Sequence, residues 1–142
     1  MNLLKLLARR YFVITVVGDS MSPTMTDGQR WLARRTRGRI PPPGALLVFA
    51  NPPDTAGAGP PYLIKRAVAV PGDPVPADVA ARVGAGRVPA GQVVVRGDNP
   101  RSRDSRHFGY VPADAVLGVA ERPVRGCWAR TRQPPSGIST AR

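Results

Sequence analysis

The strongest β-strand signal in the chain is Tyr62-Leu63-Ile64-Lys65-Arg66-Ala67-Val68-Ala69-Val70, an apolar run that contains one of only two lysines. Because side chains alternate across a strand, one face is expected to carry Leu63, Lys65, Ala67 and Ala69. Lys65 then shares its face with apolar neighbours, which solvate a charge poorly and lower the pKa of an amine. A lysine that is neutral near pH 7 can act as a general base.

Short strands joined by turns explain most of the remaining pattern. The 142 residues have the size of one domain, and 17 prolines and 15 glycines disfavour long helices. The predicted strands are Tyr11–Val17, Gln29–Arg35, Ala45–Ala50, Tyr62–Val70, Gln92–Arg96 and Val116–Glu121. Asp78–Val83 is expected to form a helical turn, and Pro112–Ala115 another short turn. The predicted fold class is therefore mainly β, a compact antiparallel fold with Pro/Gly-rich loops.

The two ends of the chain are expected to lie outside this domain, which covers residues 11–125. Residues 1–10 combine leucines with basic residues, so we expect an amphipathic surface segment or a frayed terminus. Residues 126–142 are expected to form a basic, disordered tail. No run approaches the ~20 apolar residues that a membrane span needs, so no clear transmembrane anchor is visible.

Composition limits the chemistry. The formal net charge of +12 would attract anionic lipid or nucleic acid, but a solvated basic surface is the simpler explanation. Cys127 is the only cysteine, which excludes an intrachain disulfide and a cysteine zinc site. His107 is the only histidine, which excludes a multi-histidine metal centre.

Two polar segments accompany the lysine strand. The first predicted strand runs into a turn that carries Ser20, where a serine can expose its hydroxyl and lend its own N–H to an oxyanion. The strand Gln92–Arg96 is followed by a segment dense in Asp, Ser and Arg. Taken alone the turn is a weak signal, and the second segment favours a structural network in which Asp98 and Asp104 neutralise arginines.

Three motifs follow one another in order. They are Gly18-Asp19-Ser20-Met21-x-Pro23-Thr24, then Lys65-Arg66-x-x-x-x-Pro71-Gly72-Asp73, then Gly97-Asp98-Asn99 through Ser102-x-Asp104-Ser105-Arg106-x-x-Gly109. In this order and at this rough spacing, the chain resembles the type I signal peptidase family, the S26 serine–lysine peptidases, over about Val16 to Val119. The resemblance implies a signal-peptidase-like β-fold and a serine endopeptidase that removes N-terminal signal or leader peptides. It also implies a preference for small residues at the first and third positions before the cut.

The resemblance implies roles for individual residues. Ser20 matches the nucleophile and Lys65 the general base. Ser102 matches the hydroxyl that helps to orient the lysine ammonium, and Met21 the residue that packs beside the nucleophile. Gly18 stands where some relatives carry a serine that supports the oxyanion, so the oxyanion hole here would depend more on backbone donors.

Support, partners and location are implied in the same way. The Arg66–Asp98 pair would tie the lysine strand to the third motif, and Asp104–Arg106 would be a structural ion pair beside the site. The partners would be precursor proteins with leader or signal peptides, with peripheral contact to an anionic membrane and without a cofactor or specific nucleic acid. The site would lie on the outer face of the cytoplasmic membrane, although a short form without a visible span also allows a soluble cytoplasmic protein.

Other functions stay open. A dedicated maturation protease for one partner fits the small size, and a self-cleaving repressor-type regulator also uses serine and lysine. A basic nucleic-acid-binding β-domain would use the arginines and Trp31, but its aromatic residues are not interleaved with the basic strands. A Ser-His-Asp hydrolase would have to use His107, at a position that the resemblance does not assign.

Overall fold

The computed structural model describes residues 2–53 and 59–125. Its strands are β1 (Tyr11–Thr15), β2 (Arg30–Arg35), β3 (Leu46–Ala50), β4 (Tyr62–Ala69), β5 (Gln92–Arg96), β6 (Val111–Pro112) and β7 (Val116–Pro123). Its helices are α1 (Leu3–Arg10), α2 (Ala77–Val83), α3 (Ser105–Phe108) and a short 3-10 helix at Ala113–Ala115. The predicted tail, with Cys127, and much of the loop before β4 lie outside the described residues.

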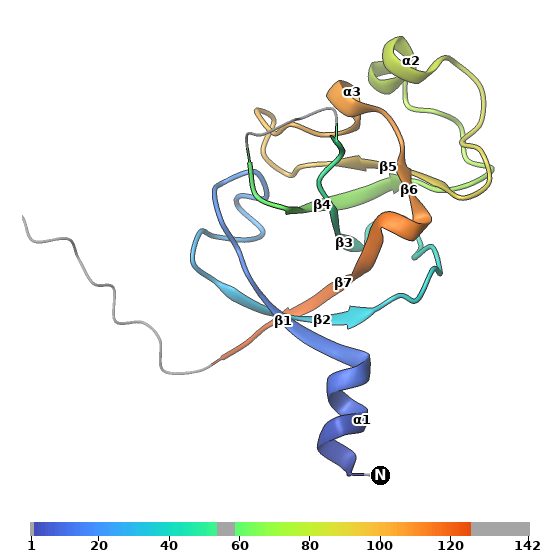
Figure 1. Cartoon of the computed structure of the whole chain (residues 1–142). Helices are drawn as coiled ribbons and strands as arrows, with labels where there is room; N and C mark the ends of the chain where they lie inside the picture. Colours follow the sequence, from blue (N-terminus) through green and yellow to red (C-terminus); the bar gives the residue numbers. More distant parts are fainter. Residues whose placement is uncertain (1, 54–58, 126–142) are drawn as a thin grey trace, which may run out of the picture.

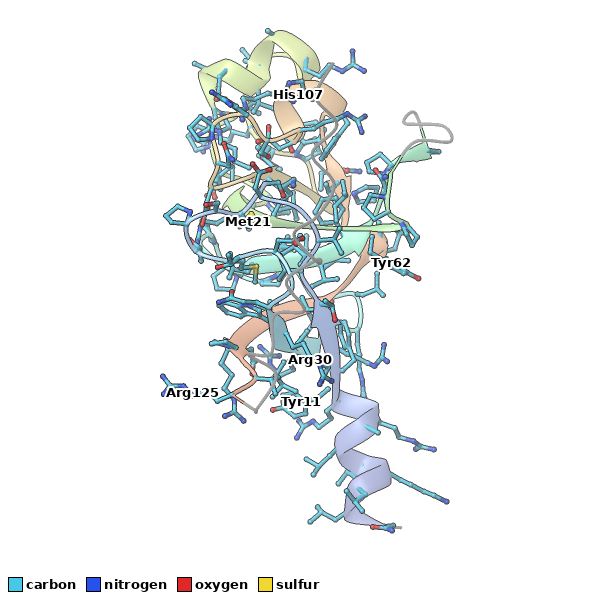
Figure 2. The ribbon with its side chains drawn as sticks, turned by 90° about the vertical axis from the view of Figure 1, so that its left-hand side faces the viewer. Tyr11, Met21, Arg30, Tyr62, His107 and Arg125 are labelled. Atoms are coloured by element: carbon cyan, nitrogen blue, oxygen red, sulfur yellow. The ribbon has the colours of Figure 1, made fainter. Side chains whose placement is uncertain are left out.

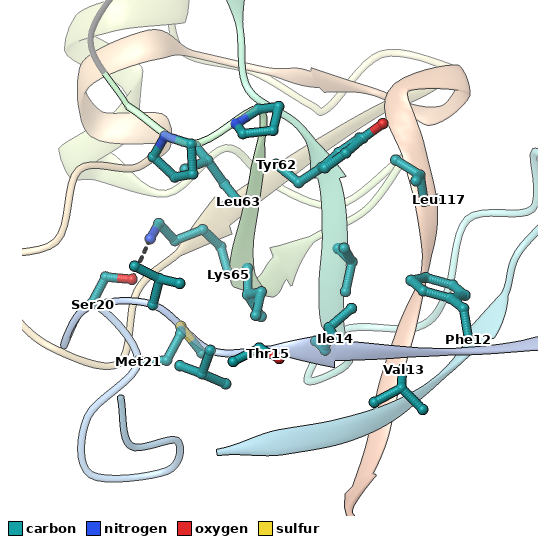
Figure 3. A pocket seen from close by; sticks show the side chains of 16 residues that line it. Phe12, Val13, Ile14, Thr15, Ser20, Met21, Tyr62, Leu63, Lys65 and Leu117 are labelled. Carbon is teal, nitrogen blue, oxygen red and sulfur yellow. Dashed lines mark hydrogen bonds between the residues drawn. The ribbon is translucent and has the colours of Figure 1, made fainter. Parts of the chain in front are cut away.

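The described strands form one antiparallel sheet, which confirms the predicted fold class. Its order is β1-β2-β7-β3-β4-β5-β6, so β7, the last strand of the described residues, inserts between β2 and β3. β1, β2 and β7 lie toward α1, and β4 and β5 lie toward α2 and α3 (Figure 1), so β1 and β4 face one another across the space shown in Figure 3. Two segments that are far apart in sequence, the end of β1 and the start of β4, therefore lie close together.

A β-bulge in β4 determines which hydrophobic cluster contains Ala69. Ala67 pairs with Val95, but Ala69 pairs with Val94, so β4 has one extra residue between them. Ala67 and Val95 pack in one hydrophobic cluster, whereas Ala69 and Val94 pack in another. The expectation that Ala69 shares the face of Lys65 is therefore wrong, because the extra residue reverses the alternation of side chains.

The N-terminal segment is a helix that projects from the sheet, at the end opposite α2 and α3 (Figure 1). The side chain of Asn2 accepts a hydrogen bond from the N–H of Leu4 and so caps the first turn. None of its residues is buried, and Leu3 and Leu4 are 68% and 73% exposed. Among the described residues, no helix is both long enough and apolar enough to cross a membrane.

Candidate active site

The turn after β1 presents Ser20. Val16 and Met21 are buried on either side of it, which anchors the turn to the core. Gly18 has a φ of +84°, a backbone conformation that L side chains rarely adopt, and its N–H donates to Asp27 Oδ1 at 2.7 Å. The backbone of this turn thus favours glycine at position 18.

Lys65 lies opposite the serine. Its side chain is 3% exposed, and its Nζ is 2.7 Å from Ser20 Oγ (Figure 3). Burial lowers the pKa of Lys65 from an ordinary value of 10.5 to about 8, and the negative charge of Asp104 opposes this shift. At neutral pH a fraction of about one tenth of Lys65 is therefore a neutral amine with a lone pair for the serine proton.

Arg66, the next residue on β4, binds the third motif. Its Nε and Nη2 atoms donate to the two carboxylate oxygens of Asp98 at 2.8 and 2.6 Å, and its Nη1 donates to the carbonyl of Gly44. The Thr24 hydroxyl donates to the same carboxylate. The hydrogen bond from Arg66 holds the pKa of Asp98 below its ordinary value. This cluster connects the serine turn, the lysine strand and the segment after β5.

A second carboxylate, Asp104, is fully buried and lies close enough to Lys65 to influence its pKa. Burial by itself would raise the pKa of Asp104, but hydrogen bonds from Arg106 and the N–H of Gly97 outweigh it and hold this pKa below its ordinary value. Arg106 Nε donates at 2.9 Å to Asp104 Oδ1, and its Nη2 donates at 2.9 Å to Oδ2. Ser102 Oγ donates to Asp104 Oδ2 at 3.2 Å. In this structure the hydroxyl of Ser102 therefore binds Asp104, and the contact with the Lys65 ammonium that the resemblance implies is not present.

Gly97 and Asn99 take part in the site, and sequence reasoning assigned neither a role. A Cβ on Gly97 would lie 1.9 Å from Ser102 Oγ and 2.6 Å from the carbonyl oxygen of Ser20, so only glycine fits between them. The backbone N–H of Asn99 donates to the carbonyl of Ser20 at 3.1 Å. Both residues were visible in the Gly97-Asp98-Asn99 motif, but only the fold reveals what they touch.

An apolar groove of about 400 Å³ leads away from Ser20 and Lys65. It runs between β1 and β4 and ends near Phe12 and Leu117 (Figure 3). β1 pairs only with β2, and β4 pairs with β5 only from Arg66 onward. Both strands thus have backbone groups along the groove without a strand partner in the described part of the chain.

His107 makes its contacts away from Ser20 and Lys65. Its side chain is about half exposed, and its Nδ1 accepts a hydrogen bond from the N–H of Asp104. Asp104 and His107 form a reciprocal cap at the start of α3, near the end of the molecule that carries α2 (Figure 2). The sole histidine therefore has a local structural contact, whereas Ser20 is hydrogen-bonded to Lys65.

Comparison with known proteins identifies relatives of this chain. The model of the family described as signal peptidase, peptidase S26, matches residues 2–83 and 76–125. The probable signal peptidase I-1 of Synechocystis sp. is 32% identical, over 78% of this chain and 71% of that protein. The mitochondrial ATP-independent inner membrane protease subunit 1b of Arabidopsis thaliana is 36% identical, over 75% of this chain and 66% of that protein. The mitochondrial inner membrane protease subunit 1 of Schizosaccharomyces pombe is 33% identical, over 70% of this chain and 64% of that protein.

The fold and these matches define a peptidase, a hydrolase of peptide bonds. The chain belongs to the signal peptidase S26 family. It spans 64% to 71% of the length of the three relatives named above.

Proposed function

We propose that this chain is a serine endopeptidase that uses a Ser20–Lys65 dyad to remove N-terminal signal or leader peptides from precursor proteins. The observation that carries the proposal is the 2.7 Å contact between Lys65 Nζ and Ser20 Oγ, in surroundings that lower the pKa of the amine to about 8. A serine hydroxyl becomes a stronger nucleophile when an adjacent base can take its proton, and a buried amine of lowered pKa can act as that base.

In the proposed reaction, neutral Lys65 takes the proton of Ser20 as Oγ attacks the scissile carbonyl. The carbonyl oxygen gains negative charge, which the N–H of Ser20 stabilises. Lys65 then returns the proton to the leaving amine as the peptide bond breaks. In the second half, Lys65 takes a proton from water as the water oxygen attacks the acyl carbon. The bond between this carbon and Ser20 Oγ then breaks, Oγ takes the proton back from Lys65, and the signal or leader peptide leaves with a new carboxyl group.

The groove favours an extended substrate. Its walls are apolar, and the free edges of β1 and β4 offer backbone hydrogen bonds to a chain that lies between them. A peptide bound in this way would bring its scissile carbonyl to Ser20 at the end of the groove. The residues before the cut would enter the groove, where we expect small side chains to be preferred, as the family resemblance implies.

We further propose that the enzyme works at a membrane surface. Helix α1 exposes leucines, and its last turn carries Arg9 and Arg10, a composition that suits the interface of an anionic bilayer. Two of the relatives are named as proteases of the mitochondrial inner membrane. A dedicated protease for one partner would use the same site, and only the range of precursors that it cleaves would differ.

The test is cleavage of a precursor that carries a signal peptide by the wild-type chain and by three variants. We expect Ser20→Ala and Lys65→Ala each to abolish cleavage, and His107→Ala to retain most of it. Retained activity in Lys65→Ala together with loss in His107→Ala would show that the dyad is wrong. Tight binding of oligonucleotides at 0.2 M salt without any cleavage would favour the nucleic-acid-binding alternative instead.

A further inference from the structure

The N–H of Ser20 is available for an oxyanion. It donates no hydrogen bond to any of the described residues. Gly18, two positions earlier, has no side chain that could serve as a second donor. The strength of the oxyanion hole therefore depends on how firmly the Asp19–Ser20 peptide is held, since a misaligned N–H stabilises the developing charge poorly.

Asn99 holds this peptide from outside the turn. Its Nδ2 donates to the carbonyl oxygen of Asp19 at 3.2 Å, and its backbone N–H donates to the carbonyl oxygen of Ser20 at 3.1 Å. The same Asp19 oxygen accepts from the N–H of Ser22 within the turn. Asn99 is thus the residue that anchors both peptides of the nucleophile to the segment after β5.

The orientation of the Asn99 amide is determined by its second contact. Its Oδ1 accepts from the N–H of Arg101 at 3.0 Å, and a backbone N–H can only face the oxygen of an amide. The Nδ2 group must then face Asp19, where it meets a carbonyl oxygen. Both ends of the side chain are satisfied, so the amide has one favourable orientation.

We infer that Asn99 is a positioning residue for the oxyanion hole, acting through the Asp19–Ser20 peptide. This inference rests on the proposed function. A trans peptide is planar, and its C=O and N–H point in opposite directions. The hydrogen bond that fixes the Asp19 carbonyl toward Asn99 therefore fixes the Ser20 N–H toward the opposite side, away from the segment after β5. The contact is made in the free enzyme, so the donor is aligned before substrate arrives.

The decisive variant is Asn99→Asp, because it keeps the oxygen that accepts from Arg101 and replaces only the donor that faces Asp19. Asn99→Ala removes both contacts without adding charge. Loss of an entire oxyanion donor lowers kcat by about 10²–10³-fold, so misalignment should lower kcat by about tenfold in both variants. The KM for a peptide that spans a signal-peptide cleavage site should change less than twofold. For Asn99→Ala the apparent pKa of the pH–rate profile should stay near the wild-type value, because Lys65 is untouched.

A second readout separates alignment from general damage. A peptide aldehyde forms a tetrahedral adduct with Ser20 and places its oxygen in the hole, whereas the corresponding peptide alcohol cannot. Aldehyde affinity should fall by the same factor as kcat, and alcohol affinity should not change. Arg101→Ala is the matched control, because it alters an exposed side chain on the same turn and should leave kcat unchanged.

The inference is overturned if kcat of both variants stays within twofold of wild type, if aldehyde affinity does not follow kcat, or if Asn99→Ala moves the pH–rate profile. Rates are expressed per folded active site, with the folded fraction taken from thermal unfolding. Ser20→Ala and Lys65→Ala distinguish a failure of the proposed function from a failure of the positioning role of Asn99. If those variants keep full cleavage, the proposed function fails; if they are inactive while the Asn99 variants are normal, only the positioning role fails.

Discussion

Replacing Lys65 with methionine measures how much the burial of this amine lowers the free energy of unfolding. An unfolded lysine keeps its proton up to pH 10.5, whereas Lys65 in the folded chain keeps it only up to about pH 8. Between these values the unfolded state binds more protons, so the free energy of unfolding of the wild type rises with pH. Below pH 8 the amine is charged in the folded state, and its burial lowers the free energy of unfolding by about 3 kcal/mol, at roughly 1.4 kcal/mol per pKa unit.

Methionine has a similar length and no charge, so Lys65→Met should be free of this cost. Loss of the hydrogen bond to Ser20 subtracts about 1 kcal/mol, which leaves the variant about 2 kcal/mol more stable than wild type at pH 7. The difference in stability should change by about 2.5 kcal/mol between pH 7 and pH 10, leaving the variant about as stable as the wild type or slightly less stable, because the amine loses its proton in the folded wild type while the unfolded wild type keeps most of it. The variant should also be inactive, so stability and catalysis would change in opposite directions.

The assay is urea unfolding of both proteins at several pH values from 7 to 10. Other titrating groups are the same in the two proteins, so their difference isolates Lys65. Lys5→Met is the matched control, because it removes the other lysine from an exposed position on α1 and should leave the pH dependence unchanged. A difference between Lys65→Met and wild type that does not vary with pH would refute the claim that burial lowers this pKa.

Three further predictions concern the same site. The kcat/KM of the wild type should rise about tenfold from pH 7 to pH 9 and then level off, whereas a lysine of ordinary pKa would give about a hundredfold rise without a plateau. Gly97→Ala should lower both kcat and the melting temperature, with about 1–3 kcal/mol of lost stability, because its Cβ would overlap the Ser102 hydroxyl; unfolding by urea measures this. Asp98→Asn should lose stability above about pH 4, with the difference from wild type vanishing as the pH falls through the lowered pKa of Asp98; acid titration followed by circular dichroism would reveal an unchanged difference if this is wrong.

Strand positions could be read from the sequence because they depend on local patterns. The predicted strand Gln92–Arg96 matches β5 at both ends, and Tyr62–Val70 exceeds β4 by one residue. The helical turn expected at Asp78–Val83 is α2, which begins one residue earlier. Alternating apolar residues and turn-forming Gly and Pro residues act over a few positions, so a single chain segment contains enough information.

Helix α3 and strand β6 were not predicted because they depend on contacts with residues elsewhere in the sequence, in β5 and the segment after it. The four residues of α3 follow Asp104, whose carboxylate accepts from the N–H of Gly97, and the hydroxyl of Ser105 accepts from the N–H of Val95 on β5. β6 has only two residues and exists through its pairing with β5. Neither element has a periodic pattern of its own, because periodicity needs more residues than these elements contain.

The sequence by itself determined the fold class and singled out Ser20 and Lys65 as the candidate reactive pair, since strand patterns are local and the three motifs stand in a recognisable order. Only the tertiary structure decided that Lys65 Nζ lies 2.7 Å from Ser20 Oγ and that Ser102 binds Asp104. It also decided that Ala69 leaves the face of Lys65 and that Asn99 binds the turn that carries Ser20. Each of these depends on how a bulge or a loop brings distant segments together. Such long-range packing depends on the whole sheet, and no short stretch of the chain specifies it.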